Sequence, residues 1–333
     1  MGFIALHMSI LGLSLLGFVV AFYIAMKKYT KAPLICPMKS DCNTVIQSHH
    51  SEFLGMRVEY LGMAYYLFVA LMHAIFVVFP VLFSPFAQFV SFTTAAIAAL
   101  FSLYLISIQG LVIKQWCVWC LTSAFVSGAI IFLTHTSIVM PLPKLFGMFT
   151  KLVTVLHLFG VTIGVGAATI TDIFFFRFLK DYKISEEEAS LLKILSNVIW
   201  AALGILLLTG VLLFLPKSET LLASGKFLTK MTAIAVLIAN GFLLNIVIQP
   251  RLARISFNEE HDHMPGELHH IRKLSFALGA ISLSSWYFIF VLGALRGVVI
   301  PYIPLVASYG GILIVAVVGS QIFDRYFIRK KIF

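Results

Sequence analysis

Four cysteines are the residues of this sequence with the most distinctive chemistry, and they fall into two close pairs. Cys36 and Cys42 form a C-x5-C pair, and Cys117 and Cys120 form a C-x2-C pair. On a helix, residues three apart share a face, and the positive end of the helix dipole lowers the pKa of a thiol in the first turn. The first pair lies on a loop that contains Pro37. A mobile pair beside a fixed, reactive pair is what sequential thiol–disulfide exchange requires.

Other uses of these cysteines remain open from the residues alone. Single cysteines in apolar helices commonly act as small packing residues, although four cysteines in two close pairs favour a shared role. The pairs could also form static structural disulfides. Four thiolates could hold zinc or iron, but zinc sites ordinarily use two short-spaced knuckles, and C-x5-C is not one. We therefore expect no metal.

The elements that must position the cysteines are membrane-spanning helices. Hydrophobic residues make up 60% of the 333 residues and charged residues only 11%, against about 25% charged in a typical soluble domain. Residues 60–113 contain no Asp, Glu, Lys or Arg, and so long a run must fold back across the bilayer. This composition excludes a soluble enzyme, a nucleic-acid-binding domain and a disordered chain. The net charge of +10 then belongs to membrane-flanking loops.

Nine uncharged runs are each long enough to span the membrane once. Prolines separate several of them, because proline cannot continue a helix interior. The expected spans are residues 4–26, 60–83, 88–112, 116–140, 152–171, 194–216, 231–250, 274–295 and 297–323. We predict an all-α polytopic membrane protein with a four-helix bundle over 1–140, a Pro-containing linker over 141–151 and a bundle of about five transmembrane helices over 152–333. Both cysteine pairs then lie at the same membrane face.

Several segments around the cysteines form a recognisable set. They are Pro33-Leu34-Ile35-Cys36-Pro37, Cys42-Asn43-Thr44-Val45-Ile46-Gln47-Ser48, Phe53-Leu54-Gly55-Met56, Leu61-Gly62-Met63-Ala64-Tyr65-Tyr66, Phe101-Ser102-Leu103-Tyr104-Leu105 and Trp116-Cys117-Val118-Trp119-Cys120. In order, spacing and helix placement this set resembles the bacterial homologues of vitamin K epoxide reductase over about residues 8–138. The resemblance implies a four-helix bundle that encloses a quinone next to the C-x2-C pair.

The resemblance also implies a role for each cysteine. Cys120 is expected to be the thiol next to the quinone, and Cys117 its exchange partner. Cys42 is expected to relay electrons from Cys36, which meets an external thioredoxin-fold protein. Ser48 matches a loop serine that the family keeps near the quinone head group. Candidate aromatic residues for the quinone pocket are Tyr65, Tyr66, Phe101, Tyr104, Trp116 and Trp119.

The function implied by the resemblance is that of a quinone-dependent protein-thiol oxidoreductase that supports disulfide-bond formation. Its cofactor would be ubiquinone or menaquinone, and its partner a separate thioredoxin-fold disulfide oxidant, since these 333 residues contain no fused thioredoxin-like domain. Ala124 stands where animal members place a tyrosine, which argues against epoxide reduction. The alternatives are a quinone-independent transmembrane thiol-electron conduit, or a non-enzymatic permease or assembly protein with structural or metal-binding cysteines.

Two arguments about membrane orientation disagree. Thiol oxidation belongs where disulfides persist, which places the cysteine face outside the cytoplasm. The expected spans put 18 of the 24 Lys and Arg residues on that same face, and the positive-inside rule makes such a face cytoplasmic. We give more weight to the chemistry and expect an integral protein of the bacterial cell membrane with both cysteine pairs extracytoplasmic.

The half formed by residues 152–333 resembles uncharacterised bacterial multi-helix membrane proteins and is expected to be a membrane domain of unknown function. His157 and Asp172 are candidates for a role there, because ionisable groups inside a membrane are often functional. Gly160, Gly164 and Gly166 lie between them, with the small-x3-small spacing of closely packed helices. The segment 261–270 holds four histidines and could bind a transition metal, but its composition favours a solvated loop.

Overall fold

The protein is built almost entirely of helices. A computed structural model describes residues 2–30, 32–36, 42–48, 51–53, 55–178, 186–244, 248, 267–295 and 299–331. By length and composition, nine helices in these ranges are candidate membrane spans. They are Phe3–Tyr29, Val58–Val78, Pro85–Ile113, Val118–Ser137, Thr150–Phe174, Ser190–Leu222, Gly225–Leu243, Lys273–Ala294 and Tyr302–Phe323. The prediction of an all-α polytopic membrane protein is confirmed.

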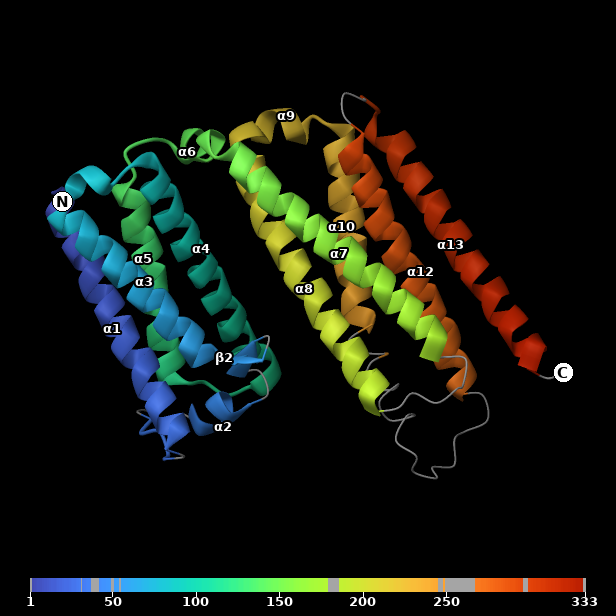
Figure 1. Ribbon diagram of the computed structural model, residues 1–333, viewed down its shortest axis with the longest axis horizontal. Coiled ribbons are helices and arrows are strands. Elements are labelled where there is room, and N and C mark those ends of the chain that lie inside the picture. The colour runs from blue at the N-terminus through green and yellow to red at the C-terminus, as the bar shows by residue number, and fades with distance from the viewer. Residues whose placement is uncertain are drawn as a thin grey trace. The chain divides into compact units, whose positions relative to one another are not determined.

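The elements follow one another along the chain as Figure 1 labels them. The first part contains α1 (Phe3–Tyr29), α2 (Cys42–Gln47), the hairpin of β1 (Glu52–Phe53) and β2 (Met56–Arg57), α3 (Val58–Val78), α4 (Pro85–Ile108) and α5 (Val118–Ser137). The second part contains α6 (Leu142–Met148), α7 (Thr150–Phe178), α8 (Glu186–Phe214), α9 (Ser218–Leu222), α10 (Gly225–Leu243), α12 (Glu267–Ala294) and α13 (Tyr302–Lys331). Short 3-10 turns at Pro80–Leu82 and Leu215–Lys217 precede α4 and α9.

Prolines set two of the helix starts. Pro85 occupies the first turn of α4, and the hydroxyl of Ser84 accepts the backbone N–H of Ala87 at 3.3 Å as its N-cap. The ninth span begins at Tyr302, five residues later than expected, because Pro301 lies just before it and Pro304 in its first turn. A proline fits the first turn of a helix, where backbone N–H groups have no intrahelical partner.

The chain divides into two compact units, Met1–Phe146 and Gly147–Phe333. The boundary lies in α6, inside the segment 141–151. In the first unit α1 packs against α3 and α5, and α4 packs against α5, so that these four helices lie side by side (Figure 1). Their buried core consists of Ile10, Ala21, Tyr66, Val69, Ala95, Val126 and Ile130.

The helices α1 and α3 approach each other closely at Gly17, which lies against the ring of Tyr66. Tyr66 is 1% exposed, and its hydroxyl is held by hydrogen bonds of 2.8 Å to the Ser123 hydroxyl and 3.1 Å to the Ser127 hydroxyl. A Cβ atom at Gly17 would lie 2.6 Å from ring atom Cδ1 and would overlap Cε1. Because the ring is held at its hydroxyl end, it cannot move aside cheaply.

We therefore expect Gly17→Ala to destabilise the protein by about 1–3 kcal/mol through overpacking. Gly12→Ala is the matched control on the same helix, since nothing lies within 4 Å of the Cβ position there, and its effect should stay within about 0.5 kcal/mol. Thermal unfolding of both variants in detergent measures the difference. Equal stability of the two variants would show that α1 and α3 are not packed as described.

A second polar contact joins α1 to α3 near the N-terminal end of α1. His7 and His73 are both fully buried, and their Nδ1 atoms are 2.8 Å apart in a hydrogen bond. The Nε2 atom of His73 bonds the hydroxyl of Ser91 on α4 at 3.1 Å. Polar side chains between membrane helices commonly act as such interhelical links, so these residues tie α1, α3 and α4 together.

The second unit packs α7 against α8 and α12, and α12 against α10 and α13. Its buried core includes Leu203, Leu237 and Trp286. The expected close packing along α7 is confirmed at Gly160 and Gly164 but not at Gly166, where nothing lies within 4 Å of the Cβ position. A Cβ at Gly160 would lie 3.1 Å from the side chains of Ile205 and Leu206, and one at Gly164 would lie 2.5 Å from the Trp286 ring.

Candidate active site

The first cysteine pair is joined as a disulfide between Cys36 and Cys42, whose Cα atoms are 6.2 Å apart. Cys36 is half-buried and ends the segment 32–36 that follows α1. Cys42 is fully buried at the first position of α2. Asn43 anchors the loop, because its side-chain oxygen accepts the backbone N–H of Leu34 at 3.0 Å. One cysteine of this pair can therefore be reached from outside, while the other faces the protein interior.

The second pair, Cys117 and Cys120, consists of two free thiols at the start of α5. Cys117 is the N-cap residue, and its sulfur accepts the backbone N–H of Cys120 at 3.4 Å. Hydrogen bonds from the Cys120 thiol and from the backbone N–H groups of Cys120 and Trp119 lower the pKa of the Cys117 thiol, although burial acts in the opposite direction. Although Cys117 is fully buried, the lowered pKa of its thiol favours the reactive thiolate form.

A distorted stretch of backbone places Cys117 in this position. The α4 helix widens into a π-helical turn at Gln109–Ile113, and Lys114 then adopts a left-handed conformation with φ of 57°. Gln109 is 3% exposed, and its side-chain oxygen accepts the backbone N–H of Cys117 at 3.0 Å. The π-turn therefore places the buried side-chain amide of Gln109 against the N-cap residue of α5. Such turns are frequent at functional sites.

The two pairs meet in one buried cluster at the end of the first unit where α1 ends and α5 begins (Figure 1). Its buried members are Val20, Ile24, Leu34, Cys42, Val45, Ile46 and Cys117, with Tyr23, Cys36, Ile113, Trp119 and Cys120 packed against them. The indole N–H of Trp119 also donates to the carbonyl of Ile35 at 3.0 Å. All four cysteines are thus gathered within one packed site.

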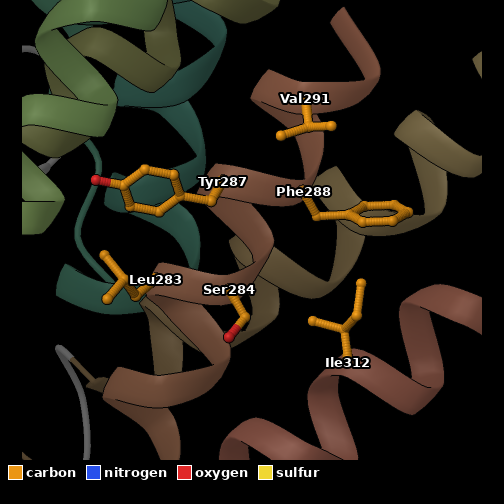
Figure 2. A pocket seen from close by; sticks show the side chains of 6 residues that line it. All are labelled: Leu283, Ser284, Tyr287, Phe288, Val291 and Ile312. Atoms are coloured by element: carbon orange, nitrogen blue, oxygen red, sulfur yellow. The ribbon is translucent and has the colours of Figure 1, made fainter. Parts of the chain in front are cut away.

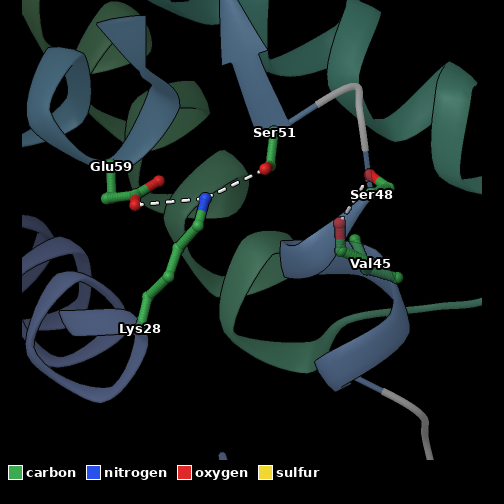
Figure 3. A network of polar contacts seen from close by, with 5 residues as sticks. All are labelled: Lys28, Val45, Ser48, Ser51 and Glu59. Atoms are coloured by element: carbon green, nitrogen blue, oxygen red, sulfur yellow. Dashed lines mark hydrogen bonds and ion pairs between the residues drawn. The ribbon is translucent and has the colours of Figure 1, made fainter. Parts of the chain in front are cut away.

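An ion pair joins α1 to α3 beside the segment that links α2 to α3, as Figure 3 shows. The ammonium of Lys28 at the end of α1 lies 3.3 Å from a carboxylate oxygen of Glu59 in the first turn of α3. It also donates to the hydroxyl of Ser51 at 2.9 Å. The Ser48 hydroxyl donates to the carbonyl of Val45 at 2.7 Å, and the Ser48 carbonyl accepts the backbone N–H of Ser51 at 3.0 Å. These bonds hold the chain between α2 and α3.

A comparison with protein families identifies this part of the chain. Residues 8–135 match the model of the vitamin K epoxide reductase family, and the match contains all four cysteines. This segment is a vitamin K epoxide reductase domain. The match ends within α5, so it does not extend to the second unit. The chain matches no curated protein and no solved structure.

The residues expected to bind a quinone lie in several places in the vitamin K epoxide reductase domain. The Tyr66 hydroxyl is already bonded to Ser123 and Ser127. The neighbouring Tyr65 hydroxyl is buried and makes no hydrogen bond among the described residues, although Ser127 lies near it. Tyr65 is therefore the expected pocket residue whose buried hydroxyl has no hydrogen-bond partner among the described residues, whereas buried polar groups ordinarily have one.

The other aromatic candidates line a different part of the domain. Phe101 is half-buried between Phe53 and Tyr104, with ring centroids 5.3 and 6.0 Å apart respectively. Tyr104 is 52% exposed and Trp116 47% exposed. The Trp116 ring lies over the π-turn, 3.0 Å from the Cβ position of Gly110.

Sequence reasoning missed three residues of the site, namely Gln109, Lys28 and Glu59. Gln109 could have been noticed as an isolated polar residue near the end of an uncharged run, just before the C-x2-C pair. Lys28 and Glu59 carry opposite charges at the ends of two consecutive spans that meet at one membrane face. Each signal becomes specific only once the helices are placed together.

In the second unit, His157 is a bonded interhelical residue. Because the Thr209 hydroxyl donates to the Ile205 carbonyl at 2.6 Å, the His157 ring N–H donates to Thr209 at 2.8 Å. Asp172 lies beside α12, with a carboxylate oxygen 3.4 Å from the Cβ position of Gly279. The histidines at 261–270 lie outside the residues whose side chains the structure describes. In the described part of the chain, no three His, Cys, Asp or Glu residues are grouped as metal ligands.

An open recess of about 400 Å³ lies between α12 and α13 (Figure 2). Five of its lining residues come from α12 and one from α13, namely Leu283, Ser284, Tyr287, Phe288, Val291 and Ile312. The recess belongs to the second unit, whereas the residues expected to bind a quinone belong to the first. It is therefore not the pocket expected beside the cysteines.

Proposed function

We propose that this membrane protein passes two electrons from a thioredoxin-fold partner, through its two cysteine pairs, to a quinone. The observation that supports the proposal is the buried cluster in which a loop disulfide meets two free thiols. The family match adds that vitamin K epoxide reductase domains typically use a quinone. The quinone would be the final electron acceptor, and the chain provides the thiols that donate the electrons.

The partner acts first on the loop pair in this proposal. A thiolate of the partner attacks Cys36, which is half-buried and therefore the more accessible sulfur. The Cys36–Cys42 disulfide is reduced to two thiols, and the partner is released with its own cysteines joined. Two electrons and two protons have then moved from the partner to the loop pair.

The loop pair then reduces the helix pair. The Cys42 thiolate attacks Cys117 of a Cys117–Cys120 disulfide, and Cys120 leaves as a thiolate. Cys36 resolves the mixed disulfide, so that Cys36–Cys42 forms again and Cys117 is released. The arrangement of one loop disulfide and two free helix thiols corresponds to the state after this step. Cys117 and Cys120 then close to a disulfide as the quinone takes up two electrons and two protons.

The experiment that tests this function uses the full chain in detergent, a reduced thioredoxin-fold protein and either a ubiquinone or a menaquinone analogue. We expect one quinol for each partner disulfide, followed optically and by thiol counting. Oxidation of the partner without quinol formation from either analogue would favour a quinone-independent conduit and overturn the proposal. Bound zinc that is lost on substitution of the cysteines would equally contradict it.

We also propose that the cysteine end of the first unit is extracytoplasmic, because disulfides persist there. A membrane-impermeant maleimide, applied to intact cells after mild reduction of the Cys36–Cys42 disulfide, is expected to label Cys36. Labelling only after lysis would place this end in the cytoplasm, as the positive-inside rule suggests for the 18 basic residues expected on that face.

A further inference from the structure

Two lysines on α10 place positive charge at one end of the second unit, and the relay of electrons described above does not use them. Lys226 and Lys230 lie in the first two turns of the helix, four residues apart and therefore on one face. Both are half-buried. Like charges at this spacing repel each other, and the positive end of the helix dipole disfavours cations in the first turn. The helix that carries the two charges therefore does not stabilise them.

Both ammonium groups instead meet the end of α12. Lys226 donates to the carbonyl of Leu295, the residue that follows α12. The Nζ atom of Lys230 lies 3.7 Å from the Cβ position of Gly293. The carboxyl end of a helix is equivalent to about half a negative charge, so it offsets only part of the two positive charges. A net positive charge remains where α10 meets the end of α12.

Within the part of the second unit that the structure describes, neither lysine forms an ion pair. The sequence gives the reason, because segments 215–230 and 295–301, which meet at this end, contain four basic residues and a single acid. That acid, Glu219, is exposed on α9. Ionisable side chains in membrane spans are costly and ordinarily have a partner or a function. The unbalanced lysine pair therefore predicts an anionic ligand.

The recess of Figure 2 lies one helical turn from the carbonyl that Lys226 binds. Its lining residues Ser284, Phe288 and Val291 have helical spacing and form one stripe along α12. Leu295 continues this stripe, since its backbone N–H still donates to the Val291 carbonyl at 3.0 Å. The recess thus runs along α12 towards the ammonium of Lys226, with α13 on its other side.

We propose that this end of the second unit binds an anionic phospholipid, with its headgroup at Lys226 and Lys230 and one acyl chain in the recess. Ammonium groups attract the headgroup phosphate, and an apolar recess of about 400 Å³ accepts methylene groups. A lipid uses both features, whereas a soluble anion would use only the lysines. The inference concerns the second unit alone and does not depend on the function proposed above.

The test measures phospholipid binding to the full chain in detergent by native mass spectrometry. Phosphatidylglycerol, which is anionic, is compared with phosphatidylcholine of the same acyl chains, which has no net charge, and we expect the first to bind more tightly. Lys226→Gln and Lys230→Gln should each weaken phosphatidylglycerol binding about fivefold, and together about 30-fold, with little change for phosphatidylcholine. The control is Lys217→Gln, which alters an exposed lysine near the start of α9 and should bind as the unaltered protein does.

A second variant tests the recess while both lysines stay in place. Val291→Trp puts a large ring at the end of the recess nearest Leu295, and Val291 is 50% exposed, so the packing of the unit is preserved. We expect both phospholipids to bind about tenfold more weakly, as for the loss of about two buried methylene groups. Val315→Trp is the matched control, because Val315 is 72% exposed on α13 and does not line the recess.

Equal affinity for the two phospholipids, or unchanged phosphatidylglycerol binding when both lysines are replaced, would overturn the headgroup site. Unchanged lipid binding in Val291→Trp would overturn the acyl-chain site. Inorganic phosphate is the remaining probe, and it should compete far more weakly than phosphatidylglycerol does. Phosphate that binds as tightly as the lipid would mean that the lysines hold a free anion, against the proposal. None of these results bears on quinone reduction.

Discussion

Cys120→Ala is expected to lower quinol formation in the presence of excess reduced partner to the uncatalysed level. Two electrons reach the quinone only as two sulfurs join, and Cys117 has no other helix thiol with which to close a disulfide. Residues that act as one chemical unit lose nearly all activity when one is removed. The quinol absorbance, followed beside a protein-free reaction, measures the loss. Turnover at the normal rate would exclude the C-x2-C pair from the reaction.

The same variant offers a positive signal that loss of folding would not give. Without Cys120, the Cys117 thiol can attack the loop disulfide, because Cys42 and Cys117 belong to the same buried cluster. A disulfide between Cys42 and Cys117 should then accumulate, with Cys36 left as the free thiol, and peptide mapping under non-reducing conditions would detect it. Its absence from a folded Cys120→Ala protein would mean that the two pairs do not exchange directly.

The membrane spans were predictable because the bilayer restricts the sequence so strongly. Uncharged runs bounded by lysine, arginine and proline mark helices of about the hydrocarbon thickness. The expected break at Pro80 and Pro85 corresponds to a 3-10 turn and the start of α4. The cysteines could likewise be placed at one face by counting crossings, and the packing of Cys42 and Cys117 in one buried cluster agrees with that placement.

The local geometry of the site could not be predicted in this way. Hydropathy does not distinguish an α-helix from the π-turn at Gln109–Ile113. The left-handed conformation at Lys114 is equally hidden, because glycine is the residue that usually marks such a position and none stands there. The bond from Cys117 to Gln109 exists only because that turn brings residues eight apart together. Cys117 was expected in the first turn of the helix, whereas it is the N-cap residue, one position before α5 begins.

The aromatic residues show a different limit of the sequence. Tyr65 and Tyr66 are adjacent and both were expected to line a pocket, yet the Tyr66 hydroxyl is used by Ser123 and Ser127 while that of Tyr65 makes no hydrogen bond among the described residues. Neighbouring residues on a helix point about 100° apart, so their surroundings depend on which helices pack on each side. Only the three-dimensional arrangement separates a structural tyrosine from one with a free donor.

Cys42→Ser is expected to disconnect the partner from the quinone while leaving the final step intact. Chemically reduced Cys42→Ser protein should form one quinol per chain, because Cys117 and Cys120 are still present, and should then stop even with excess reduced partner. The buried Cys42 is the sulfur of the loop pair that lies in the cluster with Cys117, so its loss removes the relay. A burst of quinol followed by a flat trace, recorded by stopped-flow absorbance, is the expected result.

The height of the burst and the rate after it answer separate questions. A burst of one quinol per chain requires only the helix pair, so its loss in Cys42→Ser would mean that Cys42 itself takes part in quinone reduction. Continued turnover after the burst would mean that the partner reduces the Cys117–Cys120 disulfide directly. That route is disfavoured by burial, because Cys117 is fully buried whereas Cys36 is half-buried, and exchange rates depend on access to the attacked sulfur. The loop pair is thus the part of the site through which the partner's thiol can exchange electrons with the buried Cys117.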